Sequence, residues 1–302
     1  MKKTIIIIVL LLIGYSCKQK EKNMSNILKT EKEYMYGIDL MLDLSFELYI
    51  DDILVGSRFE KSRTIMVVDI NEFLLESGEH KITLKLYPNS DSVDELLKDI
   101  MDYRVQLARW ERQRESGLGR AKNFGILQKF SISKEFPIEL EQNWSFNIDS
   151  LPYEIQGWKN SINLKNENKN NLQREVVAFY KKMGRFLIEG KSISFMEEKK
   201  HFYDEINTVE YYSKEEIKKD NILIKEDLLY WENTKVLPFE NYKLVFYANG
   251  KLVSLIRVDE KYKNFSPLIL EKELEDYEEN EYQSFEFLLH RPTQNGKLQM
   301  IR

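Results

Sequence analysis

The spacing of apolar residues changes near residue 170, and this change restricts the folds open to the chain. Before it, Phe46, Leu48 and Ile50 alternate with other residues, which is the period of two that a half-buried strand shows. Beyond it, apolar residues recur at helical spacings. We therefore predict a mixed class, β followed by α+β. A β-sandwich over residues 37–165 would precede a domain over residues 166–302, in which helices pack on an antiparallel sheet.

The first region carries several further strand signals. Asp51 and Asp52 form a predicted turn, and Gly78 precedes an alternating stretch. Pro88 ends that stretch, because proline cannot donate a ladder hydrogen bond. The expected strands lie near residues 44–50, 53–55, 64–70, 80–87, 124–133, 144–148 and 153–155. With one further strand they give the seven or eight that are typical of a sandwich.

The segment 93–115 allows two interpretations. Ser92 and Glu95 have the spacing of a capping box, which predicts a helix at the start of the segment. Apolar residues keep a helical spacing to its end, but around its middle they also alternate. We choose a helix over residues 93–101 and a strand over residues 102–110, since a later predicted strand needs a partner. One long helix is the alternative.

The second region is expected to begin with helices and to end with strands. The predicted helices cover residues 176–190, 195–206 and 213–233, and the predicted strands cover residues 243–248, 251–259, 285–290 and 297–301. Ser213 and Glu216 form another capping box. The dipeptide Asn249-Gly250, flanked by alternating stretches, is a strong hairpin signal.

The first 17 residues have the pattern of a secretory signal peptide. Two lysines precede an unbroken apolar stretch over residues 5–13, and Cys17, the chain's only cysteine, follows soon after it. Nine apolar residues are too few to span a bilayer, which takes about 20. We expect residues 1–16 to be removed and residues 17–36 to form a polar tether.

Residues 1–17 resemble the signal peptide of bacterial lipoproteins, in which the cysteine becomes the first mature residue and carries acyl chains. The usual motif has leucine three places and a small residue two places before the cysteine. Here Gly14 and Tyr15 hold those places, as in looser motifs of Bacteroidota lipoproteins. The resemblance implies that Cys17 is acylated, that membrane lipid is a partner, and that the protein lies in the cell envelope, at the outer membrane rather than the inner one. A free cysteine after an ordinary signal peptide and an uncleaved anchor are the alternatives.

Two broader resemblances concern the folded part. The two-part layout, including LPYEIQGWKNS at residues 151–161, resembles uncharacterised two-domain lipoproteins of flavobacteria, a family without an assigned activity. The element order over residues 174–302 resembles the cystatin-like cone of the nuclear transport factor superfamily. That resemblance rests on element order and not on a motif, and it implies helices packed into a curved antiparallel sheet.

Composition narrows the partners and cofactors. Loss of the signal peptide lowers the formal net charge from −5 to −7, whereas nucleic-acid binding needs a basic face, so no nucleic-acid partner is expected. With Cys17 acylated, no cysteine remains for a disulfide, a thiolate metal site or a nucleophile. His80, His201 and His290 match no zinc spacing. We therefore expect no cofactor and no metal.

Two charge clusters and one tryptophan are the candidate binding features. Basic residues gather between residues 104 and 122, where they would suit anionic lipid headgroups or an acidic partner, or form a solvated hairpin tip. The acidic run at residues 271–281 would suit a cation or a basic partner, or form a solvated surface. Trp158, in a turn beside Gly157, is the tryptophan that we expect to be exposed and to bind a ligand.

These observations favour a non-enzymatic binding module on a lipid tether. Aromatic and polar side chains would recognise a protein or glycan partner. The alternative is a small-molecule hydrolase or isomerase in a pocket of the second domain, where Tyr211, Tyr212, His201 and Asp204 would gather. A deep pocket there with a buried carboxylate or histidine favours the enzyme, and a filled interior favours the binding module.

Overall fold

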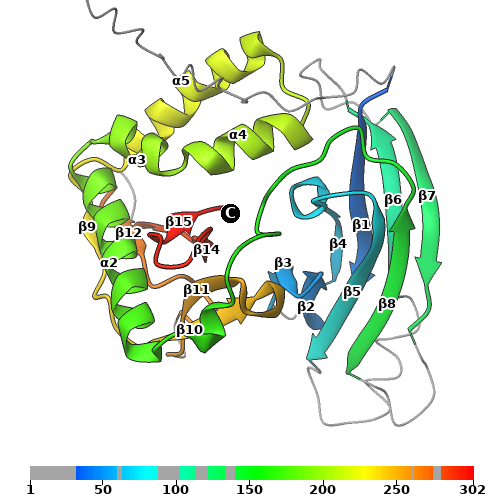
Figure 1. Ribbon diagram of the computed structural model, residues 1–302, viewed down its shortest axis with the longest axis horizontal. Helices are drawn as coiled ribbons and strands as arrows, with labels where there is room; N and C mark the ends of the chain where they lie inside the picture. The colour runs from blue at the N-terminus through cyan, green and yellow to red at the C-terminus, as the bar shows by residue number, and fades with distance from the viewer. Residues whose placement is uncertain are drawn as a thin grey trace, which may run out of the picture.

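The computed structural model describes residues 32–59, 63–87, 103–112, 122–132, 140–259, 262–274 and 280–302. Over these residues it contains antiparallel sheets and four α-helices, arranged as in Figure 1. The structure confirms the mixed β and α+β class that the change in apolar spacing predicted. None of these helices is long and apolar enough to cross a membrane.

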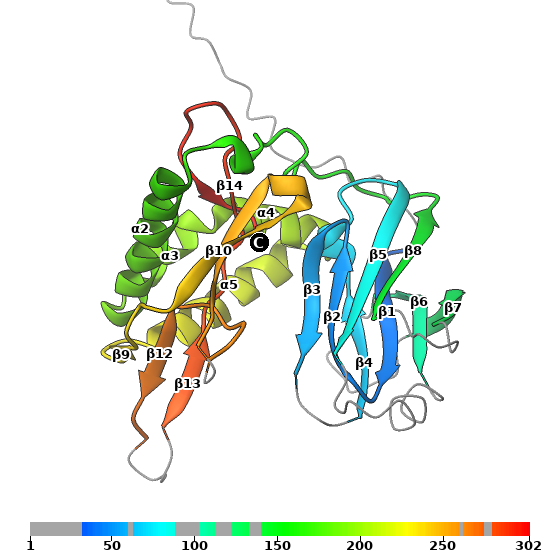
Figure 2. The same ribbon diagram turned by 90° about the horizontal axis from the view of Figure 1, so that it is seen from below.

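Two four-stranded sheets form the first region (Figure 2). One has the order β4-β1-β6-β7 and the other the order β3-β2-β5-β8. The strands are β1 (Tyr34–Leu42), β2 (Ser45–Ile50), β3 (Ile53–Arg58), β4 (Thr64–Asp69), β5 (Gly78–Tyr87), β6 (Arg104–Glu111), β7 (Lys122–Phe130) and β8 (Glu141–Ile148). Buried side chains of both sheets, such as Leu40, Leu84 and Leu107, belong to one hydrophobic cluster. Burial of these apolar faces holds the sheets together.

Most strand predictions for the first region agree with the structure. Asp51 and Asp52 both have positive φ, 49° and 68°, as a tight hairpin turn between right-twisted strands requires. A strand does occupy most of residues 102–110, as β6, whereas the predicted helix over residues 93–101 lies outside the described residues.

Two predictions in this region are wrong. Residues 153–155 do not form a strand. The amide of Ile155 donates to the carbonyl of Leu75, but no ladder continues from it. Residues 34–36, which we predicted as tether, begin β1, since Tyr36 is buried and the strand pairs with β4 and β6.

The second region begins with helices α2 (Lys169–Ile188), α3 (Ser192–Glu198), α4 (Lys200–Val209) and α5 (Lys214–Tyr230). The predicted helix over residues 195–206 is in fact split between α3 and α4 at Lys199. The predicted capping box is confirmed. The Ser213 hydroxyl accepts from the Glu216 amide at 3.2 Å, and the Glu216 carboxylate accepts from the Ser213 amide at 2.7 Å.

Seven short strands complete the second region in two sheets. Their orders are β10-β11-β14-β15 and β13-β12-β9. The strands are β9 (Lys235–Val236), β10 (Tyr242–Tyr247), β11 (Leu252–Arg257), β12 (Ile269–Lys272), β13 (Glu281–Ser284), β14 (Leu289–His290) and β15 (Gln299–Met300). The predicted hairpin at Asn249-Gly250 is confirmed, and both residues have positive φ. The last two predicted strands are present but shorter, because only two residue pairs join β14 to β15.

The interior of the second region is filled by aromatic side chains. Tyr180 of α2 is fully buried and meets Phe287 edge to face at a centroid distance of 4.9 Å. Its hydroxyl donates to the Phe287 carbonyl and accepts from the Phe287 amide. Phe195 and Phe179 also contact Phe287. These rings occupy the space between the helices and the sheet.

The two regions share one hydrophobic cluster. Val209, the last residue of α4, and Tyr211, just after it, belong to the same cluster as buried residues of β1 and β5, and so do Leu252 and Ile301. The Tyr211 hydroxyl donates to the Tyr34 carbonyl at 3.0 Å. The first and second regions therefore pack against each other through this cluster. The boundaries at residues 16 and 165 stay predictions, whereas β1 begins before the predicted boundary at residue 36.

Candidate ligand-binding groove

An open groove of about 700 Å³ lies where the first two sheets separate, beside the ends of β1 and β8. This volume lies in the usual range for small-molecule sites. Tyr34, Tyr36 and Arg109 line one wall. Asn147 and Asp149 line the facing wall, at the end of β8. The groove is thus bounded by both sheets.

The strand register places Tyr34, Tyr36 and Arg109 together. Tyr36 and Arg109 are directly opposite each other in the β1–β6 ladder, so their side chains point to the same face. By the period of two, that face is the one on which Ile38 and Leu107 are buried in the core. The groove is therefore the solvent-accessible end of the space between the sheets.

Arg109 has a distinctive environment. Its guanidinium carbon lies 4.2 Å from the centroid of the Tyr34 ring, and its side chain is half-buried. No carboxylate of the described residues forms an ion pair with it, whereas Arg104 pairs with Asp39 at 2.9 Å. A stacked guanidinium that no described carboxylate pairs with is suited to bind a carboxylate or phosphate in a bidentate manner.

Groups of both charges surround the Tyr36 hydroxyl. Burial raises the pKa of Tyr36, and Asp149 raises it further, while Arg109 lowers it. The Asn147 amide donates to the Asp149 carboxylate at 2.5 Å. Gln128 of β7, in the other sheet, donates to the Ser145 carbonyl of β8 at 3.1 Å. The groove can therefore offer a cation to one end of a ligand and hydrogen-bond acceptors to another.

The expectation that Trp158 is exposed is wrong. Its relative exposure is 6%, and the Arg302 guanidinium lies 5.2 Å from its ring centroid. The turn is held in place because the Gly157 amide donates to Glu205 of α4 at 2.7 Å. The predicted role of Trp158 in ligand binding thus loses the exposure on which it rested.

The residues proposed for an active site of the second region do not gather. Tyr211 is buried against the first region, and Tyr212 stacks with Arg112. His201 is exposed, and Asp204 pairs with Lys200 on the surface of α4. The interior of this region thus lacks the predicted constellation.

The other two histidines are buried and hydrogen-bonded. His80 contacts Asp51 at 2.7 Å, and His290 contacts the Ser161 hydroxyl at 2.8 Å. Burial lowers the pKa of His290 to about 4, so this ring is neutral at neutral pH. Within the chain segments that the structure describes, no group of histidine, cysteine and acidic residues could hold a metal ion.

The two charge clusters are divided by the fold. Arg104 pairs with Asp39, whereas Arg109 stacks on Tyr34. Arg112 binds Glu216 of α5 at 3.0 Å. Part of the acidic run, residues 275–279, lies outside the described residues. Glu271 accepts hydrogen bonds from Asn280, Lys235 and Tyr282, which lower its pKa to about 2. The sequence therefore indicated Arg109 only as one member of a cluster, and missed Tyr34 and Tyr36.

Comparison of the chain with protein-family models, with curated proteins and with solved structures finds no match. The function is therefore argued from the groove and from the sequence signals of the first residues.

A second group of titratable side chains lies where η1 (Asn71–Phe73) faces α3 and α4. Burial raises the pKa of Glu72, and burial lowers the pKa of Lys199 to about 8. Burial raises the pKa of Glu210 to about 7, with contributions from Asp69 and Glu72 and an opposing one from Arg112. These shifts arise because the packing of the two regions partly removes several charges from water.

We predict that Glu210→Gln stabilises the protein in a pH-dependent way. A carboxyl whose pKa is higher in the folded than in the unfolded chain favours folding at low pH and opposes it as pH rises. The variant should gain about 1 to 2 kcal/mol over the native protein near pH 8 and almost nothing near pH 5. Urea unfolding at both pH values measures this difference.

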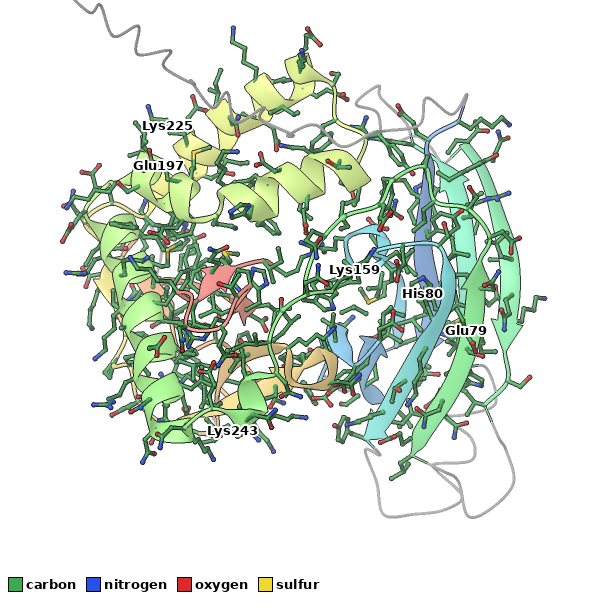
Figure 3. The ribbon with its side chains drawn as sticks, in the orientation of Figure 1. Glu79, His80, Lys159, Glu197, Lys225 and Lys243 are labelled. Atoms are coloured by element: carbon green, nitrogen blue, oxygen red, sulfur yellow. The ribbon has the colours of Figure 1, made fainter. Side chains whose placement is uncertain are left out.

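Glu197→Gln is the matched control, since Glu197 is exposed on the outer side of α3 (Figure 3). It should change stability equally at both pH values. An equal gain for Glu210→Gln at both pH values would contradict the burial of this carboxyl.

Proposed function

We propose that the protein is a binding module of the cell envelope, anchored to a membrane by acylated Cys17. In this proposal an N-terminal β-sandwich over residues 37–165 takes a ligand in its groove, and an α+β domain over residues 166–302 follows it. The observation that carries the binding role is Arg109, a half-buried guanidinium stacked on Tyr34 without a carboxylate partner among the described residues.

The chemistry of the groove supports a ligand that carries a carboxylate or phosphate. Hydrogen bonds between an arginine and such an oxyanion are short, charge-assisted and stronger than neutral ones. Asp149, Asn147 and Gln128 supply acceptors and donors for hydroxyl or amide groups of the same ligand. An acidic sugar has both kinds of group, and so does the end of a glycan or peptide chain.

The signal-peptide pattern supports the envelope part of the proposal. The resemblance to Bacteroidota lipoproteins implies that Cys17 is acylated. We propose that the acylated protein is anchored to the outer membrane. Several acyl chains would hold the protein on a bilayer permanently. The acidic net charge gives no support to a nucleic-acid partner.

The filled interior of the second region favours a binding module over a hydrolase or isomerase. Tyr180, Phe195 and Phe287 pack where a catalytic pocket would lie. The buried Ser161–His290 contact resembles part of a nucleophile–base pair. However, both side chains are buried, at 8% and 5% exposure, so a substrate would lack access.

The anchor predicts incorporation of fatty acid at Cys17. Cells that express the native chain in the presence of labelled palmitate should yield a labelled protein that sediments with envelopes. The Cys17→Ser variant should carry no label and should leave the membrane fraction, because it lacks the acyl acceptor. Equal labelling of both proteins, or recovery of the unlabelled native chain from cytosol, would contradict the anchor.

The groove predicts a preference for anionic ligands. In calorimetric titrations, glucuronate should bind and glucose should bind more weakly. Arg109→Ala should weaken glucuronate binding about 10- to 100-fold, as expected for loss of a charge-assisted pair.

Arg185→Ala, which removes an exposed arginine of α2, is the matched control and should leave the affinity unchanged. If neither glucuronate nor inorganic phosphate binds, or if Arg109→Ala binds as the native protein does, the oxyanion site is wrong.

A further inference from the structure

Strand β4 forms one edge of its sheet and exposes three consecutive apolar residues. Among the described residues it is hydrogen-bonded to β1 alone. Ile65, Met66 and Val67 in its middle are 64%, 40% and 39% exposed. Ile65 and Val67 point to the outer face of the sheet, whereas Met66 points inward like its ladder partner Leu40. Since the inward-facing residue is exposed as well, strand β3 of the other sheet does not close over this part of β4.

Strand β4 lacks the features that usually keep an edge strand from pairing with another chain. Those features are a charged residue or a proline within the strand, or a bulge. The residues between Arg63 and Asp69, TIMVV, include neither a charge nor a proline, and their register with β1 is regular. The other edge of this sheet, β7, has two register shifts and carries Lys122 and Lys129. Strand β4 is thus the edge of this sheet that is suited to accept a further strand.

The two ends of β4 carry charges of opposite sign. Arg63 directly precedes the strand, and Asp69 is its last residue. The Arg63 guanidinium donates to the Met41 sulfur at 3.1 Å and lies 3.9 Å from the Asp43 carboxylate, at the limit of an ion pair. Its side chain is 47% exposed. Because a guanidinium has five N–H donors, Arg63 can bind a second carboxylate in addition to these contacts.

Asp69 lies near two other carboxyl groups. Within the described part of the chain it forms no ion pair. Burial raises the pKa of both Glu72 and Glu210, and the charge of Asp69 raises both further, so the three carboxyl groups lie close together. Three cations offset this effect in part, namely Arg112, Lys199 and Arg302. A further cation beside Asp69 would therefore reduce the repulsion among these carboxylates.

A second copy of β4 is complementary to this edge in one antiparallel register. When Met66 lies opposite the partner's Met66, Ile65 faces the partner's Val67, and Arg63 faces the partner's Asp69. Residues directly opposite each other share a face of the sheet, so aliphatic side chains meet aliphatic ones and each arginine meets an aspartate. If the pairing were centred on Ile65 or on Val67 instead, Arg63 would no longer face Asp69. The charges at the two ends thus select both the partner and the register.

We propose that two copies of the protein pair through β4 in this antiparallel register, about a two-fold axis beside Met66. The sheet β4-β1-β6-β7 of each copy would become half of one continuous sheet. Such a contact covers both β4 edges at once, so the assembly stops at a dimer. One pair of strands buries less area than a permanent dimer does, and we therefore expect a reversible dimer with a dissociation constant of about 1 to 100 μM. The dimer depends neither on the proposed ligand nor on the proposed anchor.

Disulfide trapping tests the register. In the Cys17→Ser chain an introduced cysteine is the only thiol. Opposite Cα atoms in an antiparallel pair are about 4.5 to 5.5 Å apart, within disulfide range, so Met66→Cys should form a covalent dimer with oxidised glutathione. Ile65→Cys alone should not, since its two copies would lie about 8 Å apart, but a mixture with Val67→Cys should give the mixed dimer. Ile193→Cys, on α3 with 63% exposure, is the matched control and should stay monomeric.

Charge reversal tests the ion pairs. Sedimentation equilibrium of the Cys17→Ser chain, which has no acyl chains that could associate, gives the dissociation constant of the dimer. Arg63→Glu should raise it about tenfold, because the new carboxylate faces the partner's Asp69. Arg63→Glu combined with Asp69→Arg should restore it, since the pair is then reversed and kept. Lys243→Glu, the same change of charge at an exposed position of β10 (Figure 3), is the matched control and should leave it unchanged.

Three results would overturn the proposal. A chain that stays monomeric at every concentration up to its solubility limit would exclude the dimer. Equal trapping of Met66→Cys and Ile193→Cys, or a dimer that the combined charge reversal does not restore, would show that another surface forms the contact. Association that continues beyond two copies would show that no two-fold axis closes the β4 edge.

Discussion

The buried side chain of Asn71 connects the start of strand β1 with the end of helix α4. Its amide nitrogen donates to the carbonyls of Tyr34 and Val209, both at 3.2 Å, and its oxygen accepts from the Tyr36 amide at 2.6 Å. Its backbone carbonyl accepts from the Tyr153 hydroxyl at 3.1 Å. Each of these buried polar groups would cost about 1 to 3 kcal/mol if left unpaired. The start of β1 and the end of α4 are thereby held in one relative position.

These contacts of Asn71 position the proposed binding groove and helix α5. It fixes the first residues of β1, so Tyr34 and Tyr36 face Arg109 across the ladder and form one wall of the groove. It also fixes the end of α4, and Arg112 then holds the first turn of α5. The groove and helix α5 therefore keep a constant relative geometry.

Local patterns in the sequence predicted the elements that local physics determines. The alternation in β2 and β5, the Asn249-Gly250 turn and the capping box at Ser213 each depend on a few neighbouring residues. Strand β1 escaped prediction because YMYGIDLML is buried at nearly every position, so that Asp39 is its only charged residue and no alternation of apolar and polar residues marks it. The end of the tether and the start of β1 could not be told apart from the sequence, because pairing with β4 and β6 is what defines the strand.

The candidate site depends on contacts between distant residues, which a single sequence does not reveal. Arg109 differs from Arg104 and Arg112 only in its partners, and those partners come from the register of β1 and from α5. Trp158 was expected in solvent because its neighbours are turn residues. It is instead buried in the shared hydrophobic cluster, where Arg302, 144 positions later in the chain, lies over its ring and donates to the Glu72 carbonyl at 2.9 Å.

The most direct test of this account is native-state hydrogen exchange along a urea series. If the shared core and Asn71 join the two regions, the slowest amides of β5 and α2 should exchange with the same free energy of opening and the same dependence on urea. Exchange of the α2 amides through an opening that leaves β5 protected would show that the regions unfold separately. The groove and helix α5 would then lack the fixed relation that the Asn71 contacts impose.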